Sequence, residues 1–176
     1  LYSTKYVEWF RYRNANGCHI FGRPNSTRYV LIDDVKQEGI IRLKQDGLVS
    51  TAVIETSPDK FHVWIAATND DLPEPVATQL AKLLEQRYST DTGSADAYHL
   101  GRLPGLRNKK PKYQTYPGDG GPLVILKTAR TVPIIPDAIN ELLDKARYLA
   151  EQRTPTSSSA LGACAPIDID PSRSPM

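Results

Sequence analysis

The stretch Tyr29-Val-Leu-Ile-Asp-Asp-Val35 joins a β-branched, apolar run to two adjacent acids. Its first four residues are typical of a buried β-strand. Strand interiors rarely carry acids, and adjacent like charges repel each other, so we expect the strand to end at Asp33 and Asp34. A divalent cation is the simplest partner for the pair, because Mg²⁺ binds carboxylate oxygens and completes its shell with water and phosphates.

The two acids can share a cation only under one geometric condition. Successive residues of a regular strand point to opposite faces, so Asp33 and Asp34 must lie where this alternation has already broken. The alternative is that Asp34 caps a helix that follows the strand, as Asp commonly does. The pair alone leaves both interpretations open.

The elements around this strand predict the fold class. Hydrophobic periodicity and turn residues predict helices over residues 2–13, 35–45, 73–88 and 136–153, and strands over 18–23, 29–32, 50–55, 61–67 and 123–129. Residues 18–23 and 29–32 are interpreted as hairpin partners, and residues 89–116 as a loop with a short helix near 96–101. This order lacks strict strand–helix alternation, so it predicts an α+β fold with a mostly antiparallel sheet flanked by helices.

Length and composition limit the number of domains and the classes of protein to which the chain can belong. The 176 residues fit one domain over 1–153, and residues 154–176 are rich in Ser, Pro and small residues, as in a disordered tail. The net charge of +2 is nearly neutral, so a nucleic-acid partner must be argued from local clusters. Two distant cysteines favour a reducing cytoplasm, and the sequence shows neither a membrane-spanning run nor a signal peptide.

A third acid, Asp96, precedes a strongly basic segment. The basic residues that follow it before Asp119 are Arg102, Arg107, Lys109, Lys110 and Lys112. A carboxylate that holds a cation, beside cations that hold a polyphosphate, suits phosphoryl transfer. Tyr98, Tyr113 and Tyr116 could stack on bases. The alternative is a solvated loop in which Asp96 caps a short helix.

The segment Glu55-Thr-Ser-Pro-Asp-Lys-Phe-His62 offers further polar groups. Thr56 and Ser57 lie on a tight turn whose hydroxyls and amides could meet a phosphate, and Lys60 adds positive charge. His62 is a lone strand histidine, which is more often structural than a ligand. The three histidines form no HxH or HExxH pattern, so a zinc site is disfavoured, and nucleotide-binding glycine motifs are absent from the sequence.

Four segments along residues 9–127 together resemble a known family. They are Asn14-Ala-Asn-Gly17 with Ile20-Phe-Gly-Arg-Pro24, then Val30-Leu-Ile-Asp-Asp-Val35, then Val53-Ile-Glu-Thr-Ser-Pro58 with Trp64, and Ser94-Ala-Asp-Ala-Tyr-His-Leu-Gly-Arg-Leu-Pro-Gly105 leading to Asn108-Lys109. In this order they resemble the RepB-type primase domain of mobilizable plasmids, a divergent branch of the archaeo-eukaryotic primase superfamily.

The resemblance implies an RRM-like primase-polymerase core that performs two-metal nucleotidyl transfer. It implies that Asp33, Asp34 and Asp96 hold Mg²⁺ or Mn²⁺. The resemblance, together with the turn that carries Lys60, implies a set of nucleotide-binding residues. They are Arg23, Ser57, Lys60, His62, His99, Arg102, Asn108 and Lys109. Ser57 and His62 match a Ser-x-His-like element only with a longer spacing. The implied partners are single-stranded DNA template and nucleoside triphosphates, while a replicative helicase is left open.

The chain also departs from that family in its C-terminal part. The plasmid members carry a helical bundle after the catalytic core, whereas one helix and a tail follow here. The resemblance therefore implies primer extension in plasmid-type replication more directly than independent initiation. Two other functions remain open: a non-catalytic module that binds single-stranded nucleic acid, and a metal-dependent nuclease built on the same acids.

Overall fold

The computed structural model describes residues 4–90, 93, 95–116 and 119–153; the predicted tail lies outside them. The helices are α1 (Thr4–Ala15), α2 (Gln37–Gln45), α3 (Glu74–Tyr88) and α4 (Ile139–Gln152), with a 3₁₀ turn η1 (Pro111–Tyr113). The strands are β1 (Phe21–Gly22), β2 (Tyr29–Val35), β3 (Ala52–Ser57), β4 (Lys60–Ala66), β5 (Gly101–Arg102) and β6 (Ile125–Ala129). The mixture of helices with an antiparallel sheet confirms the predicted α+β class.

Four strands form the main sheet in the order β2-β4-β3-β6, and all neighbours are antiparallel. A tight turn joins β3 to β4, in which Asp59 follows Pro58 at a φ of +55°. Pro fixes φ for the first turn position, and Asp tolerates the left-handed conformation at the second. This confirms the hairpin predicted around Pro58 and Asp59.

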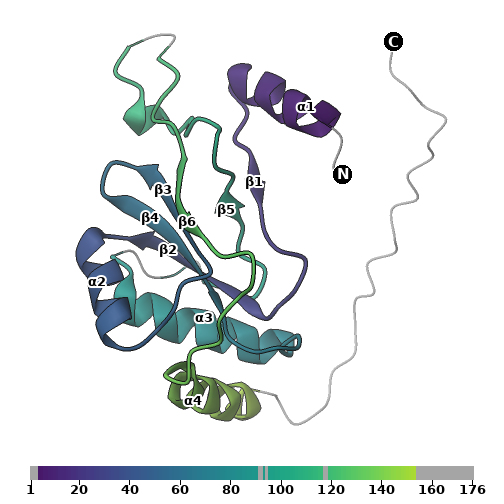
Figure 1. The fold of residues 1–176 in the computed structure, drawn as a ribbon, viewed down its shortest axis with the longest axis vertical. Helices are drawn as coiled ribbons and strands as arrows, with labels where there is room; N and C mark the ends of the chain where they lie inside the picture. Colours follow the sequence, from purple (N-terminus) through teal and green to yellow (C-terminus); the bar gives the residue numbers. More distant parts are fainter. Residues whose placement is uncertain (1–3, 91–92, 94, 117–118, 154–176) are drawn as a thin grey trace, which may run out of the picture.

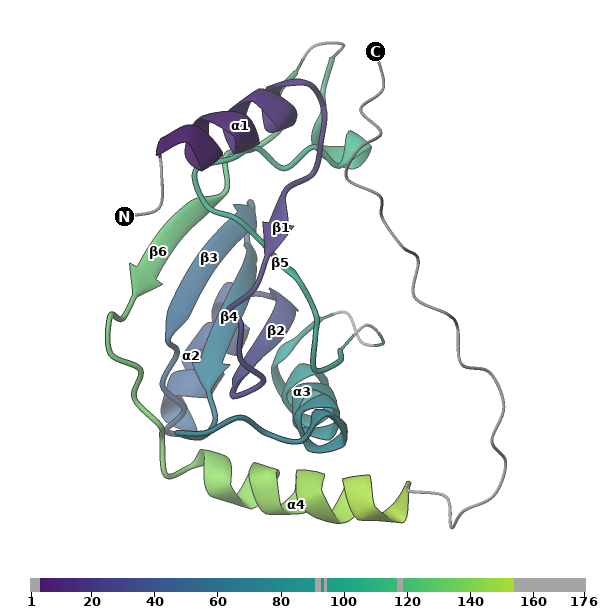
Figure 2. The same cartoon turned by 90° about the vertical axis from the view of Figure 1, so that its right-hand side faces the viewer.

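Helices α2 and α3 cover one face of this sheet, and α4 adds residues to the same core. Alternate residues of β2 and β4, including Val30, Ile32 and Val63, pack with Leu80 and Leu84 of α3 in the main core. The helix α4 packs on α3 and lies at the opposite end of the molecule from α1 (Figure 2). Burying one apolar face of each element is the principal source of stability for such a layered fold. Among the described residues, no helix has the length and apolarity needed to cross a membrane.

A short ribbon of β1 and β5 lies on the other side of the sheet from α2 (Figure 1). Phe21 pairs with Arg102 and Gly22 with Gly101. The predicted hairpin between 18–23 and 29–32 is therefore wrong, because β2 pairs with β4 and β1 pairs with the distant segment β5. The short helix expected near 96–101 is also wrong: a turn at Ala97 and Tyr98 leads directly into β5.

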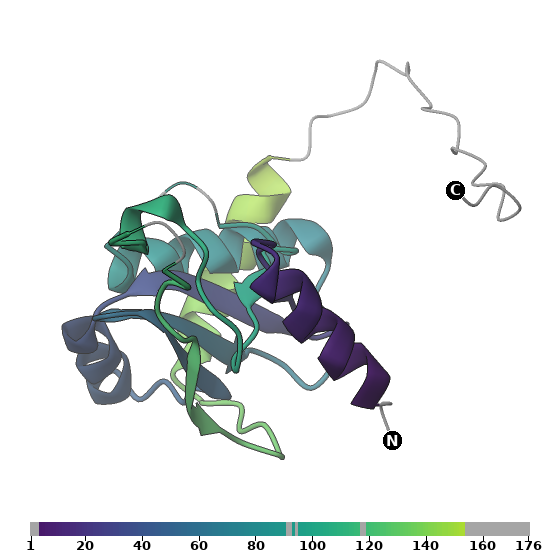
Figure 3. The same cartoon turned by 90° about the horizontal axis from the view of Figure 1, so that it is seen from above.

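The helix α1 is held by its C-terminal end. Its one buried residue, Asn14, donates from Nδ2 to the carbonyls of Cys18 and Arg107, both at 2.9 Å. Asn14 Oδ1 accepts the backbone N–H of Arg107 at 2.7 Å. Seen from above, α1 lies beside the segment that leads from β5 to β6 (Figure 3). Asn14 thus links α1 to the basic segment.

Candidate functional site

The two acids of β2 lie in a β-bulge. Ile32 pairs with Val63 and Val35 pairs with Phe61, so Asp33 and Asp34 together lie opposite the single residue His62. Asp34 has a φ of +50°, in the left-handed region that Asp enters more readily than most residues. Bulges of this kind re-aim side chains and occur often beside active sites.

The bulge places both carboxylates on one side of the sheet. Plain alternation would put Asp33 opposite the helices, beside Leu31, and would turn Asp34 toward the helical core with Ile32. Instead both acids line the same cavity, and Val35 takes the core position. The condition that alternation breaks at the acidic pair is therefore met. The N-cap of α2 is Lys36, so Asp34 does not cap the helix that follows.

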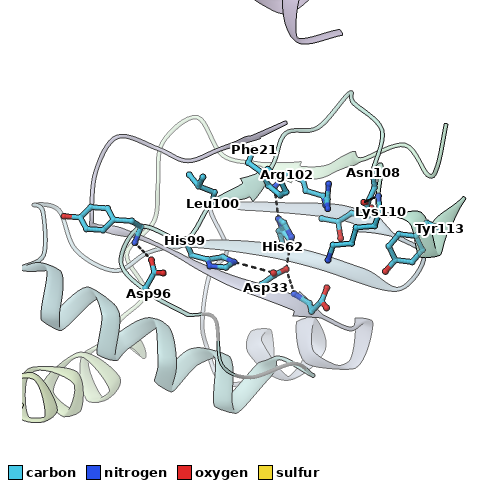
Figure 4. Close-up of a pocket in the computed structure, with 13 residues that line it drawn as sticks. Phe21, Asp33, His62, Asp96, His99, Leu100, Arg102, Asn108, Lys110 and Tyr113 are labelled. Carbon is cyan, nitrogen blue, oxygen red and sulfur yellow. Dashed lines mark hydrogen bonds and ion pairs between the residues drawn. The ribbon is translucent and has the colours of Figure 1, made fainter. Parts of the chain in front are cut away.

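Asp33 is the centre of a hydrogen-bond network (Figure 4). His62 Nε2 lies 2.8 Å from Asp33 Oδ1, and the backbone N–H of Asp34 donates to the same oxygen at 2.7 Å. His99 Nε2 lies 3.5 Å from Asp33 Oδ2. Burial alone would raise the pKa of the Asp33 carboxyl, but the hydrogen bonds from His62 and His99 outweigh it and hold the pKa well below its usual range. Asp33 is therefore ionised at neutral pH.

The acids open into a cavity of about 480 Å³ between the sheet and the β1–β5 ribbon (Figure 4). This size is ordinary for a small-molecule site. Its lining residues are Phe21, Asp33, Asp34, Thr56, His62, Asp96, Tyr98, His99, Leu100, Arg102, Asn108, Lys110 and Tyr113. The cavity therefore combines carboxylates, cations and aromatic rings, which are the groups that a nucleoside triphosphate requires.

The structure brings most of the predicted site residues to this cavity. Those that line it are Asp33, Asp34, His62, Asp96, His99, Arg102 and Asn108. Asp96 lies on the same side of Asp33 as His99, and its carboxylate accepts the backbone N–H of Tyr98 at 2.6 Å (Figure 4). Asn108 is buried and donates to the carbonyl of Thr56 at 2.9 Å, so its amide holds the basic segment against β3.

Four predicted residues do not line the cavity. The Arg23 guanidinium donates to backbone carbonyls of Pro24, Ser26 and Ala97, and so fastens β1 to the segment before β5. Lys60 Nζ lies 3.7 Å from Asp34 Oδ2. Ser57 is buried, with no hydrogen-bond partner for its Oγ among the described residues, and Lys109 lines a separate hollow beside α1.

Phe21 and Leu100 are cavity residues that the sequence prediction of the site missed, while Lys110 was named in the basic segment but not among the nucleotide-binding residues. Phe21 stacks over the Arg102 guanidinium at 4.8 Å, and this contact depends on the pairing of β1 with β5. Two-residue strands carry no hydrophobic periodicity, so neither Phe21 nor Leu100 could be placed from its own segment. Lys110 could have been included, because it follows Lys109 directly in the basic run.

The donor chemistry of the cavity fits a hard divalent cation. Mg²⁺ is commonly held by one or two carboxylates and takes its remaining ligands from water and substrate phosphates. Asp33 and Asp34 supply two carboxylates from adjacent positions. Across the described part of the chain, no three His, Cys, Asp or Glu side chains gather as a complete metal centre. The residues therefore suit a cation that the substrate helps to bind.

Comparisons with known proteins identify the family of this chain. The profile of the RepB DNA-primase N-terminal domain matches residues 7–136. Mobilization protein A of Escherichia coli is 30% identical over 152 residues, which are 82% of this chain and 21% of that protein. A DNA primase of Acidithiobacillus ferrooxidans is 30% identical over 118 residues, or 66% of this chain and 33% of that protein. The chain thus spans about a fifth and a third of these relatives.

A solved structure gives the same result. The catalytic domain of primase RepB′, in complex with initiator DNA, superposes with a TM-score of 0.73 and 27% sequence identity. The match covers 88% of this chain and 78% of that one. The matched profile spans the sheet, the bulge and the basic segment. The chain belongs to the RepB DNA-primase N-terminal domain family.

Proposed function

We propose that this chain makes or extends primers on single-stranded DNA by metal-dependent nucleotidyl transfer. The observation that carries the proposal is the bulge, which places Asp33 and Asp34 in one cavity with Arg102 and Lys110. The relatives named as a DNA primase and as a primase bound to initiator DNA support it. A purely binding module would have no use for two carboxylates among the cations that attract the DNA.

Each wall of the cavity has a task in this proposal. Asp33 and Asp34 would hold Mg²⁺ or Mn²⁺, and Asp96, which lines the same cavity, would join them when substrate phosphates complete the site. The bound ion would lower the pKa of the attacking hydroxyl and neutralise the triphosphate. Arg102 and Lys110 attract the triphosphate and offset its charge. Phe21 and Tyr113 present rings on which bases can stack.

The remaining predicted residues have supporting tasks. We propose that His99 orients Asp33, and that Lys60 balances the charge of Asp34 until the cation binds. Lys109, on the α1 side of the basic segment, would contact the template backbone, while Arg23 and Asn108 hold the cavity walls in place. Ser57 supports the turn between β3 and β4.

Primer synthesis tests the proposal directly. A single-stranded template, labelled nucleotides and Mg²⁺ or Mn²⁺ are incubated with the protein, and products are separated by length. We expect extension by the wild type and a loss of at least about 100-fold in Asp33→Asn, Asp34→Asn and Asp96→Asn, since metal activation is worth several kcal/mol. Asp144→Asn on α4, a surface residue paired with Arg147, should behave as the wild type.

Two results would contradict the proposal. Template cleavage with Mn²⁺ and no extension would identify a nuclease that uses the same acids. Salt-dependent binding of the template with neither extension nor cleavage would identify a binding module. Circular dichroism of each variant shows that a lost activity does not come from a lost fold.

A further inference from the structure

We propose that His62 is a positioning residue, which orients Asp33 for cation binding and is itself fixed by the backbone of β5. This inference rests on the proposed function and assigns His62 a different task from nucleotide contact. It is carried by three neighbours of the His62 ring: the carboxylate of Asp33, the N–H of Arg102 and the α-carbon of Gly101.

The hydrogen bonds of His62 define its tautomer. The backbone N–H of Arg102 donates to His62 Nδ1 at 3.1 Å, and a ring nitrogen that accepts a hydrogen bond carries no proton. The proton of the neutral ring is therefore on Nε2, which lies 2.8 Å from Asp33 Oδ1 and donates to it. The residue is only 4% exposed. With both nitrogens engaged and the ring buried, His62 is poorly placed to bind a triphosphate.

The same contacts distinguish the two oxygens of Asp33. Oδ1 accepts from His62 Nε2 at 2.8 Å and from the backbone N–H of Asp34 at 2.7 Å. Among the described residues, Oδ2 has one longer contact, 3.5 Å to His99 Nε2. Two short donors hold Oδ1 in place and leave Oδ2 as the better cation ligand. Groups that orient a metal-binding side chain commonly change metal affinity by about 10- to 100-fold.

Gly101 allows the approach of β5 to this ring. A Cβ built on Gly101 would lie 3.1 Å from Trp64 Cζ2 and 3.2 Å from His62 Nδ1. Both distances are tighter than ordinary contacts, so an alanine would push the β5 backbone away from the sheet. The N–H of Arg102 belongs to the next residue and would move with it. A chain of contacts thus runs from Gly101 and Arg102 through His62 to Asp33, and we call it the relay.

The test measures the binding of Mn²⁺ alone to the whole protein, without nucleotide, from the paramagnetic resonance of free Mn²⁺. The Leu and Gln side chains in His62→Leu and His62→Gln are similar in volume, but only Gln places an N–H donor near the position of His62 Nε2. We expect His62→Leu to raise the Kd for Mn²⁺ by about 10- to 100-fold and His62→Gln to recover most of the loss. The Mn²⁺ binding that is lost in Asp33→Asn defines the binding that belongs to this site.

Primer extension separates positioning from nucleotide contact. In His62→Leu the Mn²⁺ concentration for half-maximal rate should rise. The KM for nucleotide at saturating Mn²⁺ should stay within about 2-fold, because a positioning residue acts on Asp33 and not on the nucleotide. A raised KM with unchanged Mn²⁺ affinity would overturn the proposal and make His62 a nucleotide contact. Unchanged Mn²⁺ affinity with normal extension would overturn it and leave the proposed function intact.

Gly101→Ala tests the relay with His62 in place, and decides the question if His62→Leu does not fold. We expect Gly101→Ala to weaken Mn²⁺ binding by several-fold. Gly22→Ala is the matched control, because Gly22 pairs with Gly101 in the ribbon but its Cβ would meet only the side chain of Leu103. Equal Mn²⁺ affinity in the two variants would overturn the role of β5. Asp33-dependent Mn²⁺ binding without primer extension would sustain the relay and refute the proposed function.

Discussion

Asp34 has two roles: it adopts the left-handed backbone conformation of the bulge, and it supplies a carboxylate to the cavity. Its φ of +50° is unfavourable for most side chains, and β-branched residues are the least tolerant of it. We expect Asp34→Val to lower the free energy of unfolding by about 1–3 kcal/mol, the usual cost of a strained backbone conformation. Asp34→Asn should keep the stability, since Asn also tolerates this conformation, while it loses primer synthesis.

Urea unfolding of the two variants checks this prediction, and Asp34→Gly provides the reference without a side chain. Val and Asn variants of equal stability would show that the bulge relaxes when Asp34 is replaced.

The sequence could predict that strand alternation breaks at the acidic pair, because two acids in a buried strand are hard to accommodate otherwise. It could not predict His62 as the opposite residue, because that follows from the register between β2 and β4.

Among the elements, α1 depends on few contacts. Asn14 is its one buried residue, and Phe10 is half-buried, while Trp9 and Tyr12 are exposed. We expect Asn14→Ala to destabilise the protein by about 1–3 kcal/mol, because it removes three hydrogen bonds to the part-buried backbone groups of Cys18 and Arg107. Hydrogen exchange should become faster in α1 and in the segment around Arg107, with the main sheet unchanged.

The control for this prediction is Asn16→Ala. Asn16 donates only to the carbonyl of Tyr12 within the same exposed turn, so its loss should have little effect. Equal exchange rates in the two variants would contradict a role for Asn14 in linking α1 to the basic segment. Primer extension measured on the same samples shows whether that link also supports the cavity.

The predictability of each element followed the strength of its pattern. Residues 73–88 repeat apolar side chains at helical spacing and form α3 almost as predicted. The hairpin of β3 and β4 was predictable from Pro58 and Asp59. The ribbon of β1 and β5 was not, since two-residue strands more than seventy residues apart leave no local pattern. The cavity residues that the ribbon carries were missed for that reason.

For the whole molecule, the charge distribution matters more than the total charge. The net charge is +2, yet Arg102, Lys109 and Lys110 belong to one basic segment, and Arg102 and Lys110 line the cavity. We expect the binding of single-stranded DNA to weaken with salt despite the near neutrality, because each neutralised phosphate releases counterions. Lys109→Ala, which removes the proposed template contact, should reduce the slope of log affinity against log salt by about 0.7, the value for one phosphate contact on a single strand.

Fluorescence anisotropy of a labelled oligonucleotide, titrated at several salt concentrations, measures this slope. Lys145→Ala, an exposed residue of α4 at the far end of the molecule from α1, should leave it unchanged. Equal slopes for the two variants would place the DNA away from Lys109.

The bulge also bears on the number of residues in β2. Without Asp34, Asp33 alone would face His62 and Val35 would still enter the core, so the pairing of β2 with β4 would continue without interruption. The sheet therefore has no need of the extra residue, and a deletion at this point would give a simpler strand with one acid fewer. A loss of one codon could thus silence the site and leave a well-folded protein, which makes the spacing from Ile32 to Val35 a more telling mark of function than the acids themselves.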